Sequence, residues 1–438
     1  MQKTLSHSTP CLTTALKGSL QVLEKQLLGQ QNAIEEWFQS QWRISPAPIY
    51  GSVDLRNSGF KLAPIDMNLF PAGFNNLNPA FFSISVEAAK ATLAKLAPQA
   101  KNILLIPESH TRNVFYWESV AKVINILTQV GLNVRVGSLL PDYAQPTEIK
   151  LANDDVIVIE SIIRKNDIIQ LSDFVPDLIL LNNDLSNGIP DVLQNLHQPI
   201  IPPAELGWSQ RLKSEHFKYY AEVCEEFSKL IDIDPWFIAP LFSQSEEIDF
   251  MNREAEDSLT LQVEELFASI EKKYRQYDIQ CKPFVIVKAD AGTYGMAVMT
   301  VRNVDEMRSL NRKQRTSMSK SKGGQPVRNV IIQEGIYTFE TWGADNAVAE
   351  PVVYMIGERV IGGFYRVHQD RGVDENLNSP GMHFEPLAFE SCCYSPSKAD
   401  GLQKPQNRFY AYGVIARLSM LAAAREILQQ KGGLKSGE

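Results

Sequence analysis

The sequence feature that most constrains the fold is the run from residue 284 to 298, which reads FVIVKADAGTYGMAV. Phe284–Val287 are apolar or β-branched and predict a buried strand that ends at Lys288. A loop of small residues that includes Gly292 and Gly295 follows, and a second apolar run comes after it. Glycines allow a tight turn and a close approach of the backbone to a bulky anion, while free N–H groups and a lysine ammonium supply positive charge. The run therefore predicts a strand–loop–strand hairpin that can bind the phosphates of a nucleotide.

This hairpin by itself leaves two interpretations open, a nucleotide site and an ordinary hairpin that carries a surface lysine. It is not a P-loop, because the string GxxxxGK[ST] occurs nowhere in the chain. A lysine and a glycine loop between two strands resemble the part of ATP-grasp ligases that covers the triphosphate of ATP. The segments that follow favour the nucleotide site, because they come in the order expected of that superfamily.

The next segment supplies the groups expected around adenine and ribose. Val330–Ile332 predict another buried strand, and the residues that leave it include Gln333, Glu334 and Ile336. In an ATP-grasp hinge, backbone groups at such positions contact adenine and a carboxylate meets the ribose hydroxyls. Lys213, in the string RLKSEHF, is the best candidate for the earlier ATP-contacting lysine of the superfamily, and the alternatives are Lys218 and Lys229.

A cluster of carboxylates and amides comes last in this order. Residues 349–367 predict two strands joined by a Gly-Glu-Arg turn, and the run DENLNSPG follows at 374–381. Mg²⁺ is commonly held by one or two carboxylates together with nucleotide phosphates, so we expect a magnesium site here. The expected ligands are Glu350, Glu375, Asn376 and Asn378, with Asp374 as an alternative, and the expected catalytic cations are Arg366 and Lys288. A salt-bridged arginine and a polar turn are the simpler interpretations.

Bulk properties narrow the class of protein. A chain of 438 residues is too long for one simple core, so two or three domains are expected. The formal net charge of −8 disfavours a nucleic-acid partner, and no apolar run is long enough to span a membrane. The five cysteines lack metal-ligand spacing and indicate free thiols in a reducing cytoplasm, although Cys392 and Cys393 are adjacent and a disulfide between them is the less favoured alternative. The oligomeric state is not readable from the chain.

Hydrophobic periodicity indicates an α/β organisation. Apolar spacing predicts an amphipathic helix from about 13 to 39 and a second helix over 85–96, with Ser85 as a possible N-cap. From residue 102 strands alternate with helices, which predicts parallel βαβ units. We therefore expect a segment 1–100 that carries a substrate loop, a Rossmann-like domain over 101–206 and an ATP-grasp region over 207–438.

The last region adds helices to these strands. Helices are expected over 210–230, over 258–277 and over 408–431, the last ended by Gly432 and Gly433. The basic and polar run 311–325 predicts a loop, which either folds over ATP or is a solvated insertion.

Two segments carry polar side chains suited to an amino-acid substrate. The run from residue 48 to 77 holds several Asp, Asn and Arg side chains among aromatic residues, and the string SHTRN at 109–113 follows a predicted strand, where open α/β sheets bind ligands. An arginine suits a substrate carboxylate and an aspartate suits an α-ammonium. Turn capping by Asn and Asp is the alternative. The candidate substrate residues are Asp54, Arg56, Asp66, Asn68, Arg112 and Asn113.

Together these segments resemble the proteobacterial family of glutamate–cysteine ligases, which are similar to ATP-grasp enzymes. The resemblance is specific over 54–77 and 285–381 and covers nearly the whole chain. It implies ATP and Mg²⁺ as cofactors, L-glutamate and L-cysteine as small-molecule substrates, and formation of γ-glutamylcysteine through a γ-glutamyl phosphate, the first step of glutathione synthesis. The alternatives are an ATP-grasp ligase that joins a different amino-acid or peptide pair, and a nucleotide-binding regulatory protein without chemistry.

Overall fold

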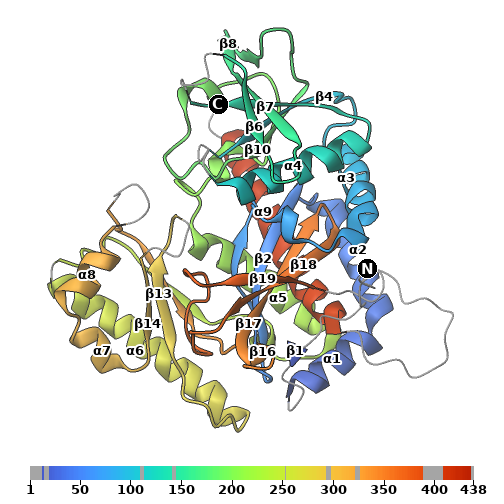
Figure 1. Ribbon diagram of the computed structural model, residues 1–438. Helices are drawn as coiled ribbons and strands as arrows, with labels where there is room; N and C mark the ends of the chain where they lie inside the picture. Colours follow the sequence, from blue (N-terminus) through green and yellow to red (C-terminus); the bar gives the residue numbers. More distant parts are fainter. Residues whose placement is uncertain are drawn as a thin grey trace.

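The computed structural model describes residues 12–13, 19–108, 113–140, 145–251, 253–292, 297–320, 326–387 and 408–435. These residues form sheets of seven, six and four strands and one two-stranded sheet. Figure 1 shows an α/β unit at the top, a central sheet lined by helices, and a smaller sheet with its own helices at the lower left. The α/β fold class expected from the sequence is confirmed.

The upper unit is built on the six-stranded sheet. Its strand order is β11-β10-β4-β5-β7-β6, and all neighbours are parallel except β6 and β7. The alternation of strands and helices predicted these parallel βαβ units correctly. The strands span Ile200–Ile201 (β11), Leu178–Asn182 (β10), Asn102–Pro107 (β4), Asn133–Ser138 (β5), Val156–Ser161 (β7) and Thr147–Lys150 (β6), and the helices Phe82–Leu96 (α3) and Val114–Gln129 (α4) pack against each other beside this sheet.

The N-terminus of α3 differs from the prediction. The helix begins at Phe82, and Phe81 stands at its N-cap without a side-chain cap. Ser85 lies inside the first turn, and its hydroxyl donates back to the carbonyl of Phe81. Ser85 is therefore not the N-cap, because the 3-10 turn that precedes the helix continues directly into it.

The central sheet joins the two ends of the chain. Its path is β1-β16-β17-β18-β19, and β2 pairs with β17 and with β3, all antiparallel. The segment 1–100 and the region 207–438 therefore share one sheet. The strands span Leu12–Thr13 (β1), Tyr50–Asn57 (β2), Leu62–Asn68 (β3), Glu340–Trp342 (β16), Ala347–Ile356 (β17), Arg359–His368 (β18) and His383–Pro386 (β19).

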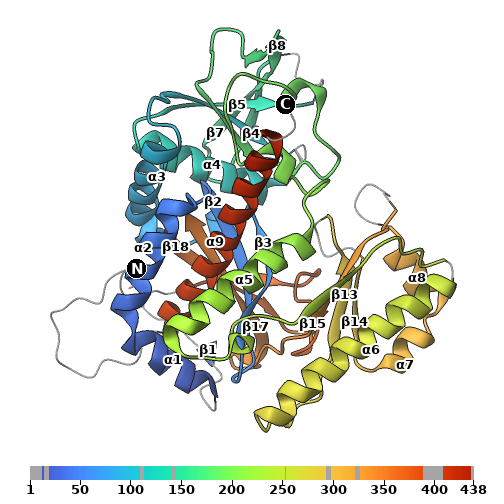
Figure 2. The same ribbon diagram turned by 180° about the vertical axis from the view of Figure 1, so that it is seen from behind.

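Helices cover one face of this sheet, as Figure 2 shows from behind. They span Ser19–Gly29 (α1), Gln31–Ile44 (α2), Lys213–Ile231 (α5) and Arg408–Lys435 (α9). The single helix predicted over 13–39 is thus two helices that meet at Gln30. The helix predicted over 408–431 continues past Gly432 and Gly433, because glycine permits a helical end without enforcing it. The residues of α9 from Tyr410 to Ala424 are themselves buried all round the helix, so it is a core helix rather than an amphipathic one.

The smaller sheet contains the predicted hairpin around Lys288. Its order is β12-β15-β13-β14, all antiparallel, and it packs against α6. The helices predicted over 210–230 and 258–277 are confirmed as α5 and α6 with shifted ends. The elements span Phe242–Ser245 (β12), Val285–Ala289 (β13), Val298–Val301 (β14), Val330–Glu334 (β15), Arg253–Gln276 (α6), Val304–Arg308 (α7) and Arg312–Met318 (α8).

The prediction of a loop over 311–325 is partly wrong. Residues 312–318 form α8, and residues 321–325 lie outside the described part. A capping box between Asn311 and Gln314 starts the helix, and Met318 is buried against the smaller sheet. The polar composition of the run suggested a loop, although the run contains the buried Met318 and the capping box of Asn311.

Short elements complete the chain. They are the strands Ile163–Lys165 (β8) and Ile168–Gln170 (β9) and the 3-10 helices Phe74–Asn76, Pro79–Phe81, Asp191–Leu193, Ala204–Leu206 and Pro235–Phe237. Among the described residues, no helix combines the length and apolar character needed to cross a bilayer.

Candidate active site

One cavity of about 1600 Å³ lies where the three large sheets meet. The smaller sheet, the β2–β3 hairpin, β17, β18 and the loops after β4 and β10 all contribute to its wall. It collects most of the side chains that the sequence argument selected. The predicted residues that line it are Asp54, Arg56, Asp66, Asn68, Asn113, Lys213, Lys288, Gly292, Gln333, Glu334, Ile336, Glu350, Arg366, Asn376 and Asn378.

Two lysines line the cavity beside the smaller sheet. Lys288, near the end of β13, donates to the carbonyl of Ile65 at 2.7 Å. Lys213, the first residue of α5, donates to the carbonyl of Gly292 at 2.9 Å, and its ammonium lies 3.5 Å from the ring centroid of Trp208. Burial lowers the pKa of Lys288 to about 8 and also lowers the pKa of Lys213. The hairpin lysine and the earlier lysine, predicted separately, thus converge on one site.

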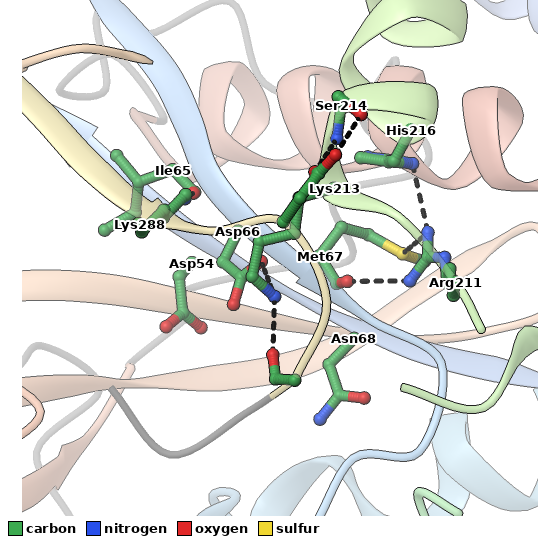
Figure 3. Close-up of polar contacts among 12 residues, drawn as sticks. Asp54, Ile65, Asp66, Met67, Asn68, Arg211, Lys213, Ser214, His216 and Lys288 are labelled. Atoms are coloured by element: carbon green, nitrogen blue, oxygen red, sulfur yellow. Dashed lines mark hydrogen bonds and ion pairs between the residues drawn. The ribbon is translucent and has the colours of Figure 1, made fainter. Parts of the chain in front are cut away.

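The carboxylate of Asp66 lies beside these lysines, as Figure 3 shows. Its Oδ1 is 3.6 Å from the ammonium nitrogen of Lys213, and 40 % of its side chain is exposed. Burial acts to raise the pKa of Asp66, but the charges of Lys213, Lys288 and Arg211 outweigh it and lower the pKa. Asp66 is therefore an anion held among cations at the cavity wall.

A carboxylate that the sequence argument missed fixes the glycine loop to α5. Asp290 accepts hydrogen bonds from the backbone N–H of Ser214 at 2.7 Å and from its hydroxyl at 2.6 Å. Gly292, at φ +96°, donates its N–H to the carbonyl of Trp208 at 3.1 Å. The bonds to Ser214 satisfy groups in the first turn of α5 and keep Lys213 next to the hairpin. Gly295 lies outside the described residues.

The hinge after β15 needs one correction. The carboxylate of Glu334 is buried and accepts hydrogen bonds from Lys61 at 2.6 Å, Trp236 Nε1 at 3.1 Å and the backbone of Leu241 at 2.9 Å. Three donors inside the protein already bind this carboxylate, which favours a structural role over the predicted contact with ribose hydroxyls. The backbone of this segment still lines the cavity, and the side-chain Nε2 of Gln333 has no partner among the described residues.

A buried cluster of two arginines and two carboxylates forms the centre of the cavity. Glu350 accepts from Arg56 Nε at 2.9 Å through one oxygen and from Arg366 at 2.5 Å through the other. Arg366 also donates to Asp54 at 2.9 Å. Burial raises the pKa of Asp54, and Arg366 opposes that shift. The cluster is charge-balanced, since each guanidinium has a carboxylate partner.

Arg56 does not fit the role predicted for it. Its guanidinium donates to Glu350, to the carbonyl of Ile336 at 3.2 Å and to the carbonyl of Glu375 at 2.5 Å. Three of its five N–H groups, one on each nitrogen, already bind groups inside the protein, which favours a positioning role over a bidentate contact with a substrate carboxylate. Arg56 instead connects β2 to the hinge and to the polar turn after β18.

The polar turn supplies fewer ligand candidates than predicted. The carboxylate of Glu375 accepts from the N–H of Gly372 at 2.7 Å and does not line the cavity, and that of Asp374 pairs with Arg302 at 2.7 Å. The predicted role of Glu375 as a metal ligand is therefore not supported. Asn376 and Asn378 do line the cavity, and the Oδ1 of Asn376 accepts from the N–H of Asn378 at 2.9 Å. Among the described residues, no three His, Cys, Asp or Glu side chains converge on one point.

The far end of the cavity lies at the carboxyl edge of the parallel sheet. Asn113 caps α4 by accepting from the N–H of Tyr116, and Asn68 closes a turn with Phe70 at 2.8 Å. Capping, the simpler alternative, accounts for both amides, although both face the cavity. Arg112 lies outside the described residues, as do His110, Cys392 and Cys393. Glu108 and Asp184 also line this end, and their places after β4 and β10 could have suggested them.

Comparisons with known proteins agree with this geometry. The family model described as glutamate-cysteine ligase matches residues 24–427. The chain belongs to the glutamate–cysteine ligase family. The family resemblance stated from the sequence is therefore confirmed.

Solved structures include one that is similar over nearly its whole length. A protein from Methylobacillus flagellatus, whose name assigns it provisionally as a gamma-glutamylcysteine synthetase, shares 54% identity with a TM-score of 0.88, and the match covers 96% of this chain and 98% of that one. A glutathione synthetase-like effector from Globodera pallida (9% identity, 84% and 80% covered) and a D-alanyl-alanine synthetase from Vibrio cholerae (8%, 73% and 81%) have TM-scores of 0.36 and 0.34, too low to support an argument. No curated protein matches the chain.

A buried hydrogen-bond network lies next to Lys213 and β3. It was not predicted from the sequence. Arg211 donates to both oxygens of Glu426 on α9 at 2.8 and 2.9 Å, and to the carbonyl of Met67 at 2.9 Å. His216 contacts Arg211 at 3.1 Å, as Figure 3 shows. Because Met67 follows Asp66 in β3, this network fixes the strand that carries Asp66 against the segment that carries Lys213.

Proposed function

We propose that this protein joins L-glutamate to L-cysteine in an ATP-dependent reaction that yields γ-glutamylcysteine, ADP and phosphate, the first step of glutathione synthesis. The observation that carries the proposal is the single cavity in which two lysines lie beside an arginine–carboxylate cluster, in a chain of this family. The lysines suit a triphosphate, and the cluster suits the charges that develop where phosphate and carboxylate meet.

The first step is transfer of a phosphoryl group. An oxygen of the glutamate γ-carboxylate forms a bond to the γ-phosphorus of ATP, the bond from that phosphorus to the β–γ bridging oxygen breaks, and ADP leaves. Lys213, Lys288 and Arg366 supply positive charge to the transferred group, as such a transfer requires. Arg366 suits this role because its side chain lines the cavity, and its buried Nε has no hydrogen-bond partner among the described residues.

The second step forms the amide. The cysteine amine attacks the acyl carbon of γ-glutamyl phosphate, phosphate leaves with the electrons of the carbon–oxygen bond, and the amine loses a proton. No covalent enzyme nucleophile is needed, so the contribution of the protein is to position the two substrates and neutralise charge.

The residues of the cavity fit a magnesium ion. Glu350, Asn376 and Asn378 offer the hard oxygen donors that Mg²⁺ prefers, and each Glu350 oxygen accepts a single arginine bond, which leaves a second lone pair. These residues would hold the ion together with ATP phosphates, and the ion would neutralise phosphate charge. Gln333 and the backbone of Ile336 would contact adenine. We place the enzyme in the cytoplasm, where ATP and reduced thiols are available.

A coupled assay of ADP release across amino-acid pairs tests the proposal. We expect turnover only when glutamate and cysteine are both present, with a product whose γ-linkage is confirmed by mass spectrometry. Faster ADP release with another pair would point to a different ATP-dependent ligase. ATP binding without amino-acid-dependent turnover would point instead to a regulatory protein.

A further inference from the structure

We propose that the carboxylate of Asp66 couples the two substrate sites, so that bound ATP strengthens the binding of glutamate. The inference rests on the proposed function and assigns the link between nucleotide and amino acid to one residue. It follows from the position of Asp66 among the cations of the cavity.

Strand β3, which carries Asp66, lies against both lysines. Two successive residues of β3 contact the two lysines: the carbonyl of Ile65 accepts from Lys288 at 2.7 Å, and the carboxylate of Asp66 is 3.6 Å from Lys213. Figure 3 shows both lysines near this strand. The exposed part of the Asp66 side chain faces the cavity. A phosphate that binds these lysines therefore comes within a few ångströms of the Asp66 carboxylate.

The negative charge of Asp66 affects how a phosphate binds beside it. Phosphate and carboxylate are both anions, and like charges at short range inside a protein oppose each other strongly. Asp66 already interacts with Lys213 and Lys288, so it opposes nucleotide binding by competing with phosphate for these two cations. A cation placed on Asp66 removes that opposition and makes the same position favourable beside the phosphates.

The cation best suited to bind Asp66 is the α-ammonium of glutamate. Both amino-acid substrates carry an α-ammonium, but the amine of cysteine must lose its proton to attack. A carboxylate partner stabilises the protonated form and would hinder that loss. The ammonium of glutamate takes no part in bond formation, so it is the group that suits Asp66. Glutamate bound there compensates Asp66 and favours ATP, and by thermodynamic reciprocity ATP favours glutamate to the same extent.

Calorimetry with a non-hydrolysable ATP analogue tests this coupling. AMP-PNP with Mg²⁺ is titrated alone, and L-glutamate is titrated with and without saturating AMP-PNP, so that no reaction follows. In the parent protein we expect the analogue to tighten glutamate binding by about fivefold, the lower end of the usual range for coupled sites. In Asp66→Asn we expect this ratio to fall to about 1.

Asp66→Asn also has an outcome that simple damage would not give. We expect AMP-PNP alone to bind about two- to fivefold more tightly, because removing a partly exposed charge changes the binding free energy by about as much as a surface ion pair contributes. Glutamate should bind more weakly. Asp66→Glu keeps the charge and should keep the coupling. The matched control is Asp305→Asn, the same change at a carboxylate that is 87% exposed on α7, away from the cavity, which should change neither affinity.

Three outcomes would overturn the inference: unchanged coupling in Asp66→Asn, weaker binding of both ligands in that variant, or no coupling in the parent protein. If Asp66→Asn fails to fold, Asp66→Ser is the second neutral variant to which the same criteria apply. ADP release by the parent protein with glutamate and cysteine is measured in parallel. Its absence would reject the proposed function, whereas normal release without coupling would reject only this inference.

Discussion

Arg56 donates its Nε–H to Oε2 of Glu350 across 2.9 Å, and both side chains are almost fully buried. The same guanidinium donates to the carbonyl of Ile336 in the segment after β15, so one side chain connects the β2–β3 hairpin, β17 and that segment. This contact makes Arg56 a positioning residue for Glu350.

We expect Arg56→Ala to destabilise the protein by about 3 kcal/mol, because a buried carboxylate then loses one of its two cationic partners. Urea unfolding followed by fluorescence measures the change. The double variant Arg56→Ala/Glu350→Gln should recover part of the loss, since the unpaired charge is gone. A single variant as stable as the parent protein, with only the Michaelis constant for glutamate increased, would restore the substrate role first predicted from the sequence.

Lys288→Met should reduce kcat by roughly 100-fold or more, the usual cost of losing a donor that stabilises transition-state charge. The melting temperature should not fall, because methionine keeps the apolar stem and removes a buried charge. Steady-state kinetics and thermal unfolding give both values, with Lys90→Met on the exposed face of α3 as the control. Normal turnover by Lys288→Met would show that the hairpin does not hold phosphate.

The pKa of Lys288, lowered by burial to about 8, predicts the pH dependence of nucleotide capture. The ammonium is charged below that pH, so kcat/KM for ATP should fall as the pH rises through about 8. Bound phosphate stabilises the ammonium, so kcat should not show this decline at the same pH. A pH profile of both constants tests this, and Lys288→Arg, which stays charged, should lack the decline. A profile of Lys288→Arg identical to that of the parent protein would assign the decline to another group.

Two substitutions of Asn376 test the proposed magnesium site, because they should shift the Mg²⁺ requirement in opposite directions. Asn376→Ala removes an oxygen donor and should increase the Mg²⁺ concentration needed for half-maximal activity. Asn376→Asp keeps the acceptor for the N–H of Asn378 and adds charge, so it should lower that concentration. Activity is titrated against Mg²⁺ for both variants and for Glu350→Gln. Unchanged dependence in all three would exclude these residues as ligands.

Glu426 predicts the behaviour of the fold in acid. Burial alone would raise its pKa, but Arg211 and His216 lower it to about 2, below the ordinary value of 4.5. The unfolded chain therefore takes up a proton at a pH where the folded protein does not, and the free energy of unfolding should decrease between about pH 4.5 and 2. The loss is on the order of 3 kcal/mol. Urea unfolding across this range measures it. Glu426→Gln should be less stable at neutral pH and should lose less in acid, while the exposed Glu271→Gln should follow the parent protein.

Local structure was largely predictable from local patterns. The strand that ends near Lys288, the strand before Gln333 and the parallel sheet after residue 102 follow from alternation, burial and turn residues, all of which act over a few positions. Errors fell at element ends, as at Ser85 and at Gly432, at the break near Gln30, and in the run 311–325, which contains α8. At these places a short-range pattern permits more than one outcome.

The sequence by itself determined most of the charged side chains that gather in the cavity, because strand ends and glycine loops carry charged groups where sheets meet. Only the tertiary structure decided what each group does there. Arg56 contacts Glu350 across 294 positions and Lys61 contacts Glu334 across 273, so their partners depend on which strands pair and which helices cover them. The chemistry of a side chain is local, but long-range packing decides which partner it contacts, and this is why the partners of Arg56 and Glu334 could not be predicted from the sequence.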